Sequence, residues 1–235
     1  MPSAGGQAGK SAGGGYVLRQ VTRDKVWNRL IMFVTLLRDN PEFYIAWVVV
    51  VAFSICMHEF AHAWMASRQG DHTAREHGYM SLNPLRVMGP TALICLALFG
   101  IAWGSVPVDP RRMRTSRSHA LVALAGPAAN LLLAAVGAGV AWPAALAANQ
   151  PAYFVAGIAL RANTFLLLFN LLPVPILDGW EVWSWIFPPL RRIPAQQARQ
   201  AGMIILLIVL LSGLFQYVWD AAFALSALVL SGLPG

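Results

Sequence analysis

An apolar run long enough to cross a lipid bilayer carries three ionisable side chains in its second half. The run covers residues 43–67 and contains the motif His58-Glu59-Phe60-Ala61-His62. About 20 mostly apolar residues form a helix that spans a hydrocarbon core about 30 Å thick, in which every backbone polar group needs an internal partner. Ionisable side chains inside such a helix are costly unless they pair with one another or bind an ion. The motif is therefore expected to have a chemical role.

The spacing of the motif indicates a metal site. On a helix, His58 and His62 lie four residues apart on one face, where both can bind a single zinc ion. Glu59 is then placed as the general base that takes a proton from the metal-bound water, as in zinc hydrolases with this signature. Two histidines leave a catalytic zinc one protein ligand short, because such sites usually have three.

The composition is that of an integral membrane protein. Of the 235 residues, 57% are apolar and only 11% are charged, and the mean hydropathy is +0.58. The net charge of +7 comes from basic residues dispersed over segments that flank apolar runs. This distribution favours contact with anionic lipid headgroups and argues against nucleic acid as a partner.

The chain divides into a polar tail, a short helix and a membrane domain. The first 15 residues are Gly, Ala and Ser with few others and lack the apolar core of a signal peptide, so we expect a disordered tail over residues 1–25. Residues 26–42 include an apolar stretch that is too short for a span and carries Arg29, which favours an interfacial helix. Residues 43–235 are expected to form the membrane domain.

Four apolar runs are long enough to cross the membrane, and they cover residues 43–67, 119–142, 152–172 and 202–219. Residues 221–230 could continue the last span beyond Asp220, lie flat, or pack as a short return helix. Residues 91–103 hold too few apolar residues to cross as a helix, so a re-entrant or β-hairpin segment is expected within 91–110. The predicted fold class is an all-α polytopic membrane protein with about four to six transmembrane helices.

Arginine counts orient these spans. Residues 68–118 carry seven arginines and residues 191–199 carry three, whereas residues 143–151 carry none. The positive-inside rule then places the two arginine-bearing regions in the cytoplasm. The six basic residues among the first 42 would be left outside, which opposes this orientation. If residues 91–103 crossed fully, the N-terminus would be inside, but the two parts of the metal site would end on opposite faces.

Asp178 is the candidate for the third ligand. It follows two prolines that break the end of a predicted transmembrane helix. Broken backbone at membrane depth is tolerated only where it is buried in protein or lines a wet cavity, and a carboxylate there is costly unless it is paired or metal-bound. The other acidic residues lie before the first span, in polar loops or at the end of the last span.

These motifs resemble the site-2 protease family of intramembrane zinc metalloproteases. That family combines an HExxH motif on one membrane helix with an NxxPxxxLDG segment on another, and residues 58–62 and 170–179 match them. Further matches are Asn83-Pro84-Leu85 and Ala125-Gly126-Pro127, and the likeness covers residues 43–215. No soluble stretch is long enough for an inserted PDZ or CBS domain, so the compact subgroup is indicated.

The resemblance implies a role for each matched residue. His58, His62 and Asp178 would bind one zinc ion, and Glu59 would be the general base. Asn130 and Asn170 match family asparagines near the site, and we expect them to support substrate binding or the transition state. The loop after Asn83-Pro84-Leu85 departs from many relatives, which affects the local loop structure but none of these ligands.

The function predicted on this basis is regulated intramembrane proteolysis. The chain would be a zinc endopeptidase that cuts transmembrane segments of other membrane proteins, as a multi-pass protein of a prokaryotic plasma membrane. Residues 91–110 could act as a strand or gate that holds the unwound substrate. Two alternatives remain open, a membrane metal-ion transporter and a catalytically inactive scaffold of the same family. The oligomeric state is not indicated by the sequence.

Overall fold

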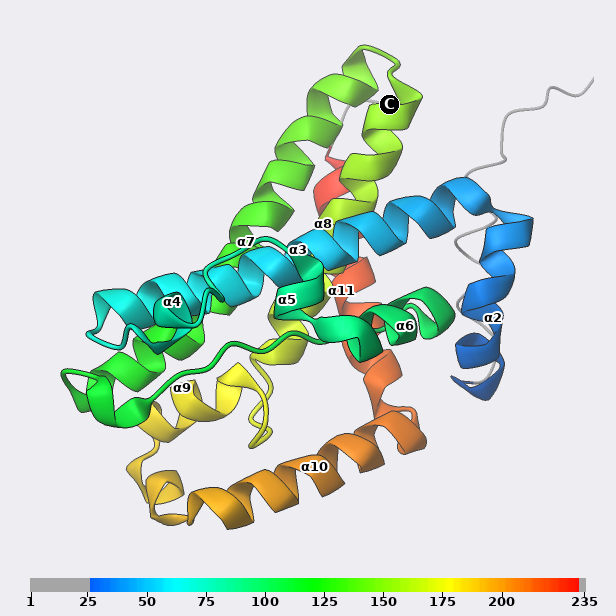
Figure 1. Ribbon diagram of the computed structural model, residues 1–235. Helices are drawn as coiled ribbons and strands as arrows, with labels where there is room; N and C mark the ends of the chain where they lie inside the picture. Colours follow the sequence, from blue (N-terminus) through cyan, green and yellow to red (C-terminus); the bar gives the residue numbers. More distant parts are fainter. Residues whose placement is uncertain (1–25, 233–235) are drawn as a thin grey trace, which may run out of the picture.

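The computed structural model describes residues 26–232, so the predicted disordered tail over residues 1–25 lies outside the described range. Within that range the chain is helical and has no strand. Five of the helices are long and apolar enough to cross a membrane. The prediction of an all-α polytopic membrane protein is thereby confirmed (Figure 1).

The five candidate spans are α3 (Pro41–Arg68), α7 (Ser116–Leu146), α8 (Gln150–Asn170), α10 (Ala195–Ser212) and α11 (Leu214–Ser231). The shorter elements are α2 (Val26–Asp39), α4 (Thr73–Glu76), α5 (Pro84–Val87), α6 (Gly89–Phe99), α9 (Asp178–Ile186) and two 3-10 turns, Pro110–Arg112 and Pro188–Arg192.

The helix that carries the histidine motif begins at a well-defined cap. The Asn40 side chain accepts a hydrogen bond from the Phe43 amide at 3.1 Å, and Pro41 occupies the first turn, where its missing N–H is not needed. From there α3 runs for 28 residues, or about 42 Å at 1.5 Å per residue. This length exceeds the thickness of the hydrocarbon core, about 30 Å. The helix can therefore cross the membrane with the His58–His62 motif inside the hydrocarbon core.

Three helices form the centre of the molecule. α7 packs along α8 and also along α3, and the turn between α7 and α8 projects away from the remaining helices (Figure 1). Gly137 allows the backbones of α7 and α8 to approach closely, because a Cβ atom there would lie 2.9 Å from the Leu160 nitrogen. The side chains of Cys56 and Leu96 are almost completely buried in the apolar core beside α3.

The segment for which a re-entrant loop or a β-hairpin is predicted contains a short helix. α6 covers only 11 residues and ends at Gly100, whose φ of +73° suits glycine. Residues 101–109 form neither helix nor strand, and they run along the molecule as an extended trace (Figure 1). The β-hairpin alternative is therefore wrong, and one reason is that Pro107 and Pro110 lack the N–H groups that a strand ladder needs. α6 is too short to cross a membrane as a helix.

The predicted span over residues 202–219 is also wrong in its boundaries. Gly213 has a φ of +81° and separates α10 from α11, so that the chain forms two helices of 18 residues each. Asp220, which was expected to end the span, lies inside α11 and accepts a hydrogen bond from Gln216 Nε2 at 2.6 Å. Of the three alternatives for residues 221–230, continuation beyond Asp220 is borne out in part, because these residues extend the helix that begins at Leu214, although Gly213 separates that helix from residues 202–212.

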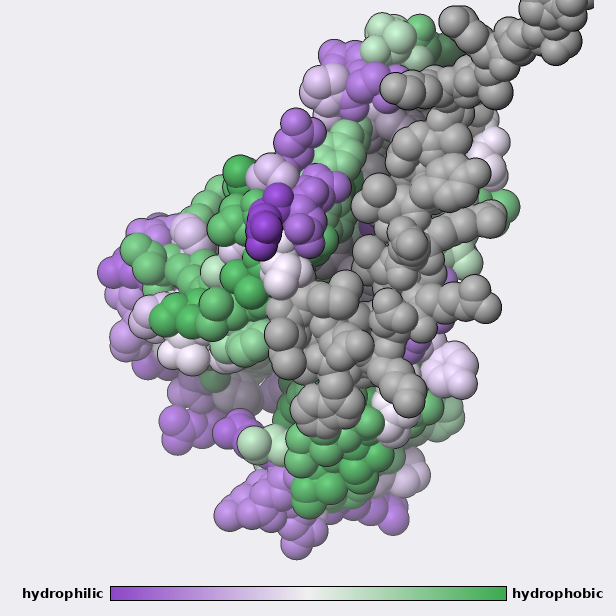
Figure 2. All heavy atoms as spheres, turned by 90° about the vertical axis from the view of Figure 1, so that its right-hand side faces the viewer, coloured by the Kyte–Doolittle hydropathy of each residue, from purple (hydrophilic) through white to green (hydrophobic). Residues whose placement is uncertain are grey.

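α10 stands apart from the central helices. It contacts α11 at one end and crosses below the bundle (Figure 1). Figure 2 shows apolar side chains gathered in the lower part of the molecule, at the level of α10, with hydrophilic ones below them. The exposed apolar residues of this helix are Met203, Ile204, Ile205, Leu207, Ile208 and Leu211. An apolar exposed surface of this kind suits a helix that faces lipid.

α2 corresponds to the predicted helix within residues 26–42. It packs against α6 and α3, and its Phe33 ring lies 5.1 Å from the ring of Tyr44. Its location at the membrane interface stays a prediction.

Candidate metal centre

Two histidines and one aspartate converge between α3 and α9. His58 Nε2 lies 2.9 Å from His62 Nε2, and Asp178 Oδ2 lies 3.0 Å from the first and 3.3 Å from the second. A tetrahedral zinc ion with bonds of about 2.0–2.1 Å separates its ligand atoms by about 3.3 Å. The three atoms therefore form a triangle of nearly the size that zinc requires. Among the described residues, His58, His62 and Asp178 are the group of side chains that could hold a metal ion.

The hydrogen bonds of the imidazoles leave both Nε2 atoms free to bind a metal. His62 Nδ1 lies 2.7 Å from the Val122 carbonyl oxygen, which can only accept, so Nδ1 carries the proton. His58 Nδ1 lies 2.6 Å from Asn130 Oδ1 and donates in the same way. Asp178 Oδ2 is buried and has no hydrogen-bond donor in the described part of the chain. The unprotonated Nε2 atoms of both histidines and the Asp178 carboxylate oxygen thus lie together, an arrangement that fits a bound cation.

A glycine of α7 provides the space beside these atoms. A Cβ atom at position 126 would lie 2.5 Å from His58 Nε2 and closer still to His62 Nε2. Val122, Gly126 and Asn130 are spaced by four residues, so one face of α7 supplies both hydrogen-bond acceptors and the open space between them. Gly126 belongs to the matched segment Ala125-Gly126-Pro127, where a kink that permits close packing was one interpretation, but its contact with the two histidines was not predicted.

Asp178 reaches the histidines because the chain breaks after α8. α8 ends at Asn170, residues 171–177 form a series of turns, and Asp178 is the first residue of α9. The turn requires Gly179, since a Cβ atom there would lie 2.5 Å from the Leu171 carbonyl oxygen. Trp183 Nε1 donates to the same carbonyl at 3.0 Å. These contacts hold the start of α9 against the end of α8.

Glu59 lies beside the triangle and is covered by the extended segment. Its exposed fraction is 8%. Gly104 lies directly against it, because a Cβ atom at that position would be 2.9 Å from Glu59 Oε1. The segment of residues 101–109, for which no helix or strand forms, therefore passes over the predicted general base. This contact could not be predicted from the sequence.

A buried carboxylate fixes the far end of that segment. Asp71, in the loop after α3, accepts hydrogen bonds from the Thr73 amide at 3.0 Å and from the Asp109 amide at 2.7 Å. Burial raises the pKa of the Asp71 carboxyl, but these hydrogen bonds and the charge of Arg112 lower it by more, so its pKa lies below the ordinary value. The end of α3 and the end of the extended segment are thus joined.

The two predicted asparagines lie in different surroundings. Asn130 is fully buried and contacts His58, as described above. Asn170 is the half-buried last residue of α8. Support of substrate binding or of the transition state stays a prediction for both.

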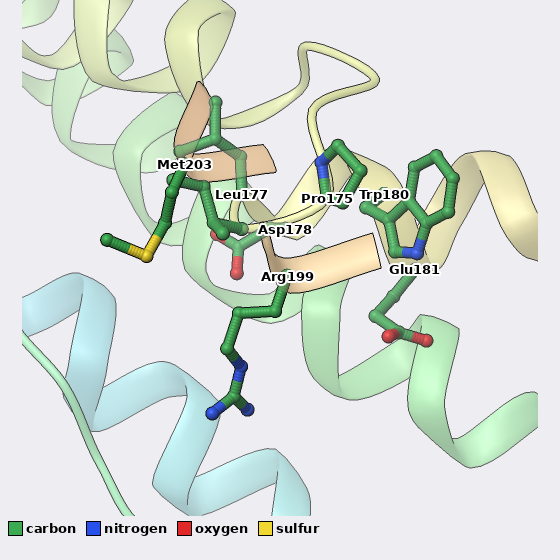
Figure 3. A pocket seen from close by; sticks show the side chains of 8 residues that line it. Pro175, Leu177, Asp178, Trp180, Glu181, Arg199 and Met203 are labelled. Carbon is green, nitrogen blue, oxygen red and sulfur yellow. The ribbon is translucent and has the colours of Figure 1, made fainter. Parts of the chain in front are cut away.

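A cavity of about 410 Å³ opens beside Asp178. It lies between the residues before α9 and helix α10, from which Arg199 and Met203 reach it (Figure 3). Its other lining residues are Pro175, Ile176, Leu177, Trp180 and Glu181. The one carboxylate of the candidate metal centre is therefore also the part that faces an open space.

Two histidines and an aspartate that meet beside a glutamate in a helical membrane protein form the donor set of a metallohydrolase. Comparison with known proteins agrees. The chain is 35% identical over 182 residues to a Bacillus subtilis protein named "Putative zinc metalloprotease YwhC", covering 73% of this chain and 82% of the relative. It is 35% identical to the Mycolicibacterium smegmatis protein named "Putative zinc metalloprotease Rip2", covering 74% of this chain and 71% of the relative.

The Rip2 protein of Mycobacterium tuberculosis strain H37Rv is 34% identical over 182 residues, covering 70% of this chain and 67% of the relative. No protein-family model matches the chain, and no solved structure gives a significant match. The chain belongs to the family of zinc metalloproteases that includes these bacterial proteins. It is accordingly a membrane metalloprotease with zinc as its cofactor.

Proposed function

We propose that this chain is an intramembrane zinc endopeptidase of the site-2 protease type, which cuts within transmembrane segments of other membrane proteins. The observation that carries the proposal is the triangle of His58 Nε2, His62 Nε2 and Asp178 Oδ2, with sides of 2.9–3.3 Å. His58 lies ten residues before Arg68, the last residue of α3, which is about 15 Å along a helix. A site at that distance from a helix end supports chemistry inside the hydrocarbon layer.

Each residue has a role in this proposal. His58, His62 and Asp178 would hold the zinc ion, which when bound polarises the scissile carbonyl and makes a water molecule more acidic. Glu59 takes a proton from that water at Oε1 and delivers it to the leaving nitrogen. Gly104 and the extended segment cover Glu59, and exclusion of bulk water strengthens electrostatic interactions at the carboxylate.

The asparagines differ in their proposed roles. Asn130 uses its oxygen on His58 and its nitrogen on Asn163, which supports a role in orienting His58 in addition to the predicted support of the transition state. Asn170 ends α8 at the chain break before Asp178, which suits a role near a bound substrate.

A transmembrane substrate must unwind before cleavage, because a helix hides its peptide bonds in internal hydrogen bonds. The cavity between Asp178 and α10 is the nearest open space for the unwound chain. Residues 101–109 offer an extended backbone beside Glu59, which supports pairing with the unwound substrate in the manner of an added strand. The bacterial origin of the relatives supports a prokaryotic plasma membrane as the location.

The alternative of a metal-ion transporter has less support. A transport path needs ligands at several depths, whereas the donors within the described residues 26–232 gather in one group. The relatives are also named as proteases.

Reconstitution with a single-span substrate tests the proposal. Purified chain in liposomes should contain one zinc ion per chain and cut the substrate at a bond inside its apolar segment, as located by mass spectrometry of the products. Glu59→Gln should keep the zinc and lose cleavage, because the amide cannot accept a proton from water. Asp178→Ala should lose zinc. Cleavage only outside the apolar segment would contradict the intramembrane reaction, and appreciable cleavage by Glu59→Gln would contradict the role of Glu59. A zinc-loaded wild-type chain that cuts none of a panel of single-span substrates would favour the inactive scaffold.

A further inference from the structure

A chain of buried polar side chains connects His58 to α8. Beyond its contact with His58, Asn130 donates through Nδ2 to Asn163 Oδ1 at 3.0 Å. Asn163 in turn donates through Nδ2 to Ser54 Oγ and to the Ala159 carbonyl oxygen, each at 2.9 Å. The exposed fractions of Ser54, Asn130 and Asn163 are at most 1%. Bulk water therefore does not compete for these hydrogen bonds.

A backbone carbonyl determines which atom donates and which accepts in each hydrogen bond of this series. The two ends of an amide side chain are similar in shape, so a neighbour with only one possible role decides which end it presents. The Ala159 carbonyl can only accept, and it therefore requires Asn163 Nδ2 to face it. Asn163 Oδ1 must then face Asn130, which answers with its own Nδ2. Asn130 Oδ1 is left for His58, whose Nδ1 must carry the proton.

The consequence lies at the metal centre. With its proton on Nδ1, His58 presents an unprotonated Nε2 toward His62 and Asp178, as metal binding requires. His62 reaches the same state in one step, because its Nδ1 meets the Val122 carbonyl directly. Both imidazoles are thus oriented by backbone carbonyls, one on α7 and the other on α8 through two asparagines.

We propose that Asn163 is a positioning residue of the metal centre, which acts through Asn130 to hold His58 in its metal-binding tautomer. The proposal rests on the proposed metal centre and extends it to α8. If Asn163 is removed, the Asn130 amide can turn over and present Nδ2 to His58. His58 would then accept at Nδ1 and carry its proton on Nε2, where it blocks a zinc ion.

Three variants measure this effect, namely Asn163→Leu, Asn130→Leu and the double variant. Zinc affinity is measured in detergent by competition with a chromophoric chelator. Loss of a hydrogen-bond partner behind a ligating histidine typically weakens metal binding by about 10–100-fold. We expect a loss in that range for Asn130→Leu and a loss of about tenfold for Asn163→Leu. The double variant should bind no more weakly than Asn130→Leu alone, because Asn163 acts only through Asn130.

A neighbouring residue provides the matched control. Thr164 follows Asn163 on α8 and is also buried, but its hydroxyl donates to the Leu160 carbonyl of the same helix at 2.8 Å. Thr164→Val should bind zinc as the wild type does. Asn163→Ala is measured alongside Asn163→Leu, so that one variant leaves a cavity and the other fills it. The visible spectrum of the cobalt(II)-loaded protein reports on ligand geometry, and thermal unfolding of the metal-free protein shows whether a variant is simply less stable.

The outcomes separate the two proposals. A tenfold loss for a folded Asn163 variant, an altered cobalt spectrum and non-additive losses would support the positioning role. Wild-type affinity in both folded Asn163 variants, or additive losses in the double variant, would overturn it while leaving the metal centre intact. If the wild-type chain itself binds no zinc, the proposed function fails and the positioning role fails with it.

Discussion

Gly126→Ala is the smallest change that places an atom directly in the candidate metal centre. The added Cβ atom would lie 2.5 Å from His58 Nε2 and 2.6 Å from His58 Cε1, and nearer still to His62 Nε2. Non-bonded carbon and nitrogen atoms ordinarily stay about 3.5 Å apart. The imidazoles or α7 must therefore move by about 1 Å, whereas a zinc site tolerates changes of only about 0.2 Å in its ligand distances.

Either movement weakens zinc binding. If the imidazoles turn away, their Nε2 atoms leave the position that a metal needs. If α7 withdraws so that the histidines can keep their metal-binding positions, overpacking of this kind costs about 1–3 kcal/mol. Where this cost falls on the metal-bound state alone, it corresponds to about 5–150-fold in affinity at 1.4 kcal/mol per factor of ten. Withdrawal also draws the Val122 carbonyl and Asn130 away from the two Nδ1 atoms, because both belong to the same face of α7. We expect the dissociation constant for zinc to rise at least tenfold.

The assay compares Gly126→Ala with Gly139→Ala, a change of the same kind on the same helix. A Cβ atom at position 139 meets no atom within 4 Å, so this control should keep the zinc affinity of the wild type and gain slightly in helix stability. Chelator competition gives the affinities, and the cobalt(II) spectrum reports the ligand geometry. A Gly126→Ala protein with wild-type affinity and an unchanged spectrum would refute the role of this glycine and the placement of the metal between the histidines.

Three further changes test other parts of the structure. Gly104→Ala should reduce cleavage at least tenfold but leave zinc affinity unchanged, since a Cβ atom there would lie 2.9 Å from Glu59 Oε1 and not against the ligands; equal losses of both would contradict this separation. Asp71→Asn should destabilise the fold by about 1–3 kcal/mol at neutral pH. Because the pKa of the Asp71 carboxyl is lowered in the folded chain, its contribution is present above the unfolded pKa and is lost as pH falls through the folded pKa; the difference between wild type and variant in thermal unfolding should shrink in acid, and a constant difference would be the contrary result. The orientation in the membrane is tested with single cysteines that replace Gln69, Thr115, Asn149 or Gln197 in a background without Cys56 and Cys95. A membrane-impermeant thiol reagent applied to intact cells should label only the cysteine at position 149. Labelling at position 69 without labelling at position 115 would contradict the predicted topology.

The meeting of His58, His62 and Asp178 could be predicted because each residue carried its own signal. The histidines share a motif whose spacing fixes a common helix face, and Asp178 lies at a chain break that is unusual at membrane depth. A carboxylate at membrane depth needs a partner, and a metal site that lacks one ligand is a suitable partner. Ionisable residues at membrane depth therefore predict the site more specifically than hydropathy predicts the helix boundaries.

The boundaries of the last two helices could not be predicted in the same way. Gly213 interrupts a long apolar run, and a single glycine inside a helix costs only about 1 kcal/mol relative to alanine. Hydropathy therefore does not distinguish a glycine that a helix tolerates from one that ends it. Asp220 misled the prediction because a carboxylate was expected to mark a helix end, whereas Gln216 satisfies it within α11.

The face that α7 presents to the metal centre was also hidden. Nearly every residue of this helix is apolar or small, so no polar stripe marks the positions 122, 126 and 130 that contact the histidines. At position 122 the contact is made by the backbone carbonyl, and at position 126 by the absence of a side chain. Neither feature can be predicted from the residue type. Such features become visible only when the helices are placed against one another.

The enclosure of the metal centre is uneven, and this bears on where a substrate meets it. His58 and His62 have exposed fractions of 7% each and are held by hydrogen bonds to α7, so the side formed by α3 and α7 is closed. The Asp178 side chain is 23% exposed, comes from a short turn and borders the cavity of about 410 Å³. Beyond that cavity lies α10, which has few partners in the bundle and presents Arg199 and Met203 to the same space (Figure 3). His58 and His62 therefore form the closed side of the candidate centre. The open side lies at Asp178 and α10, where a reacting peptide would have room to enter.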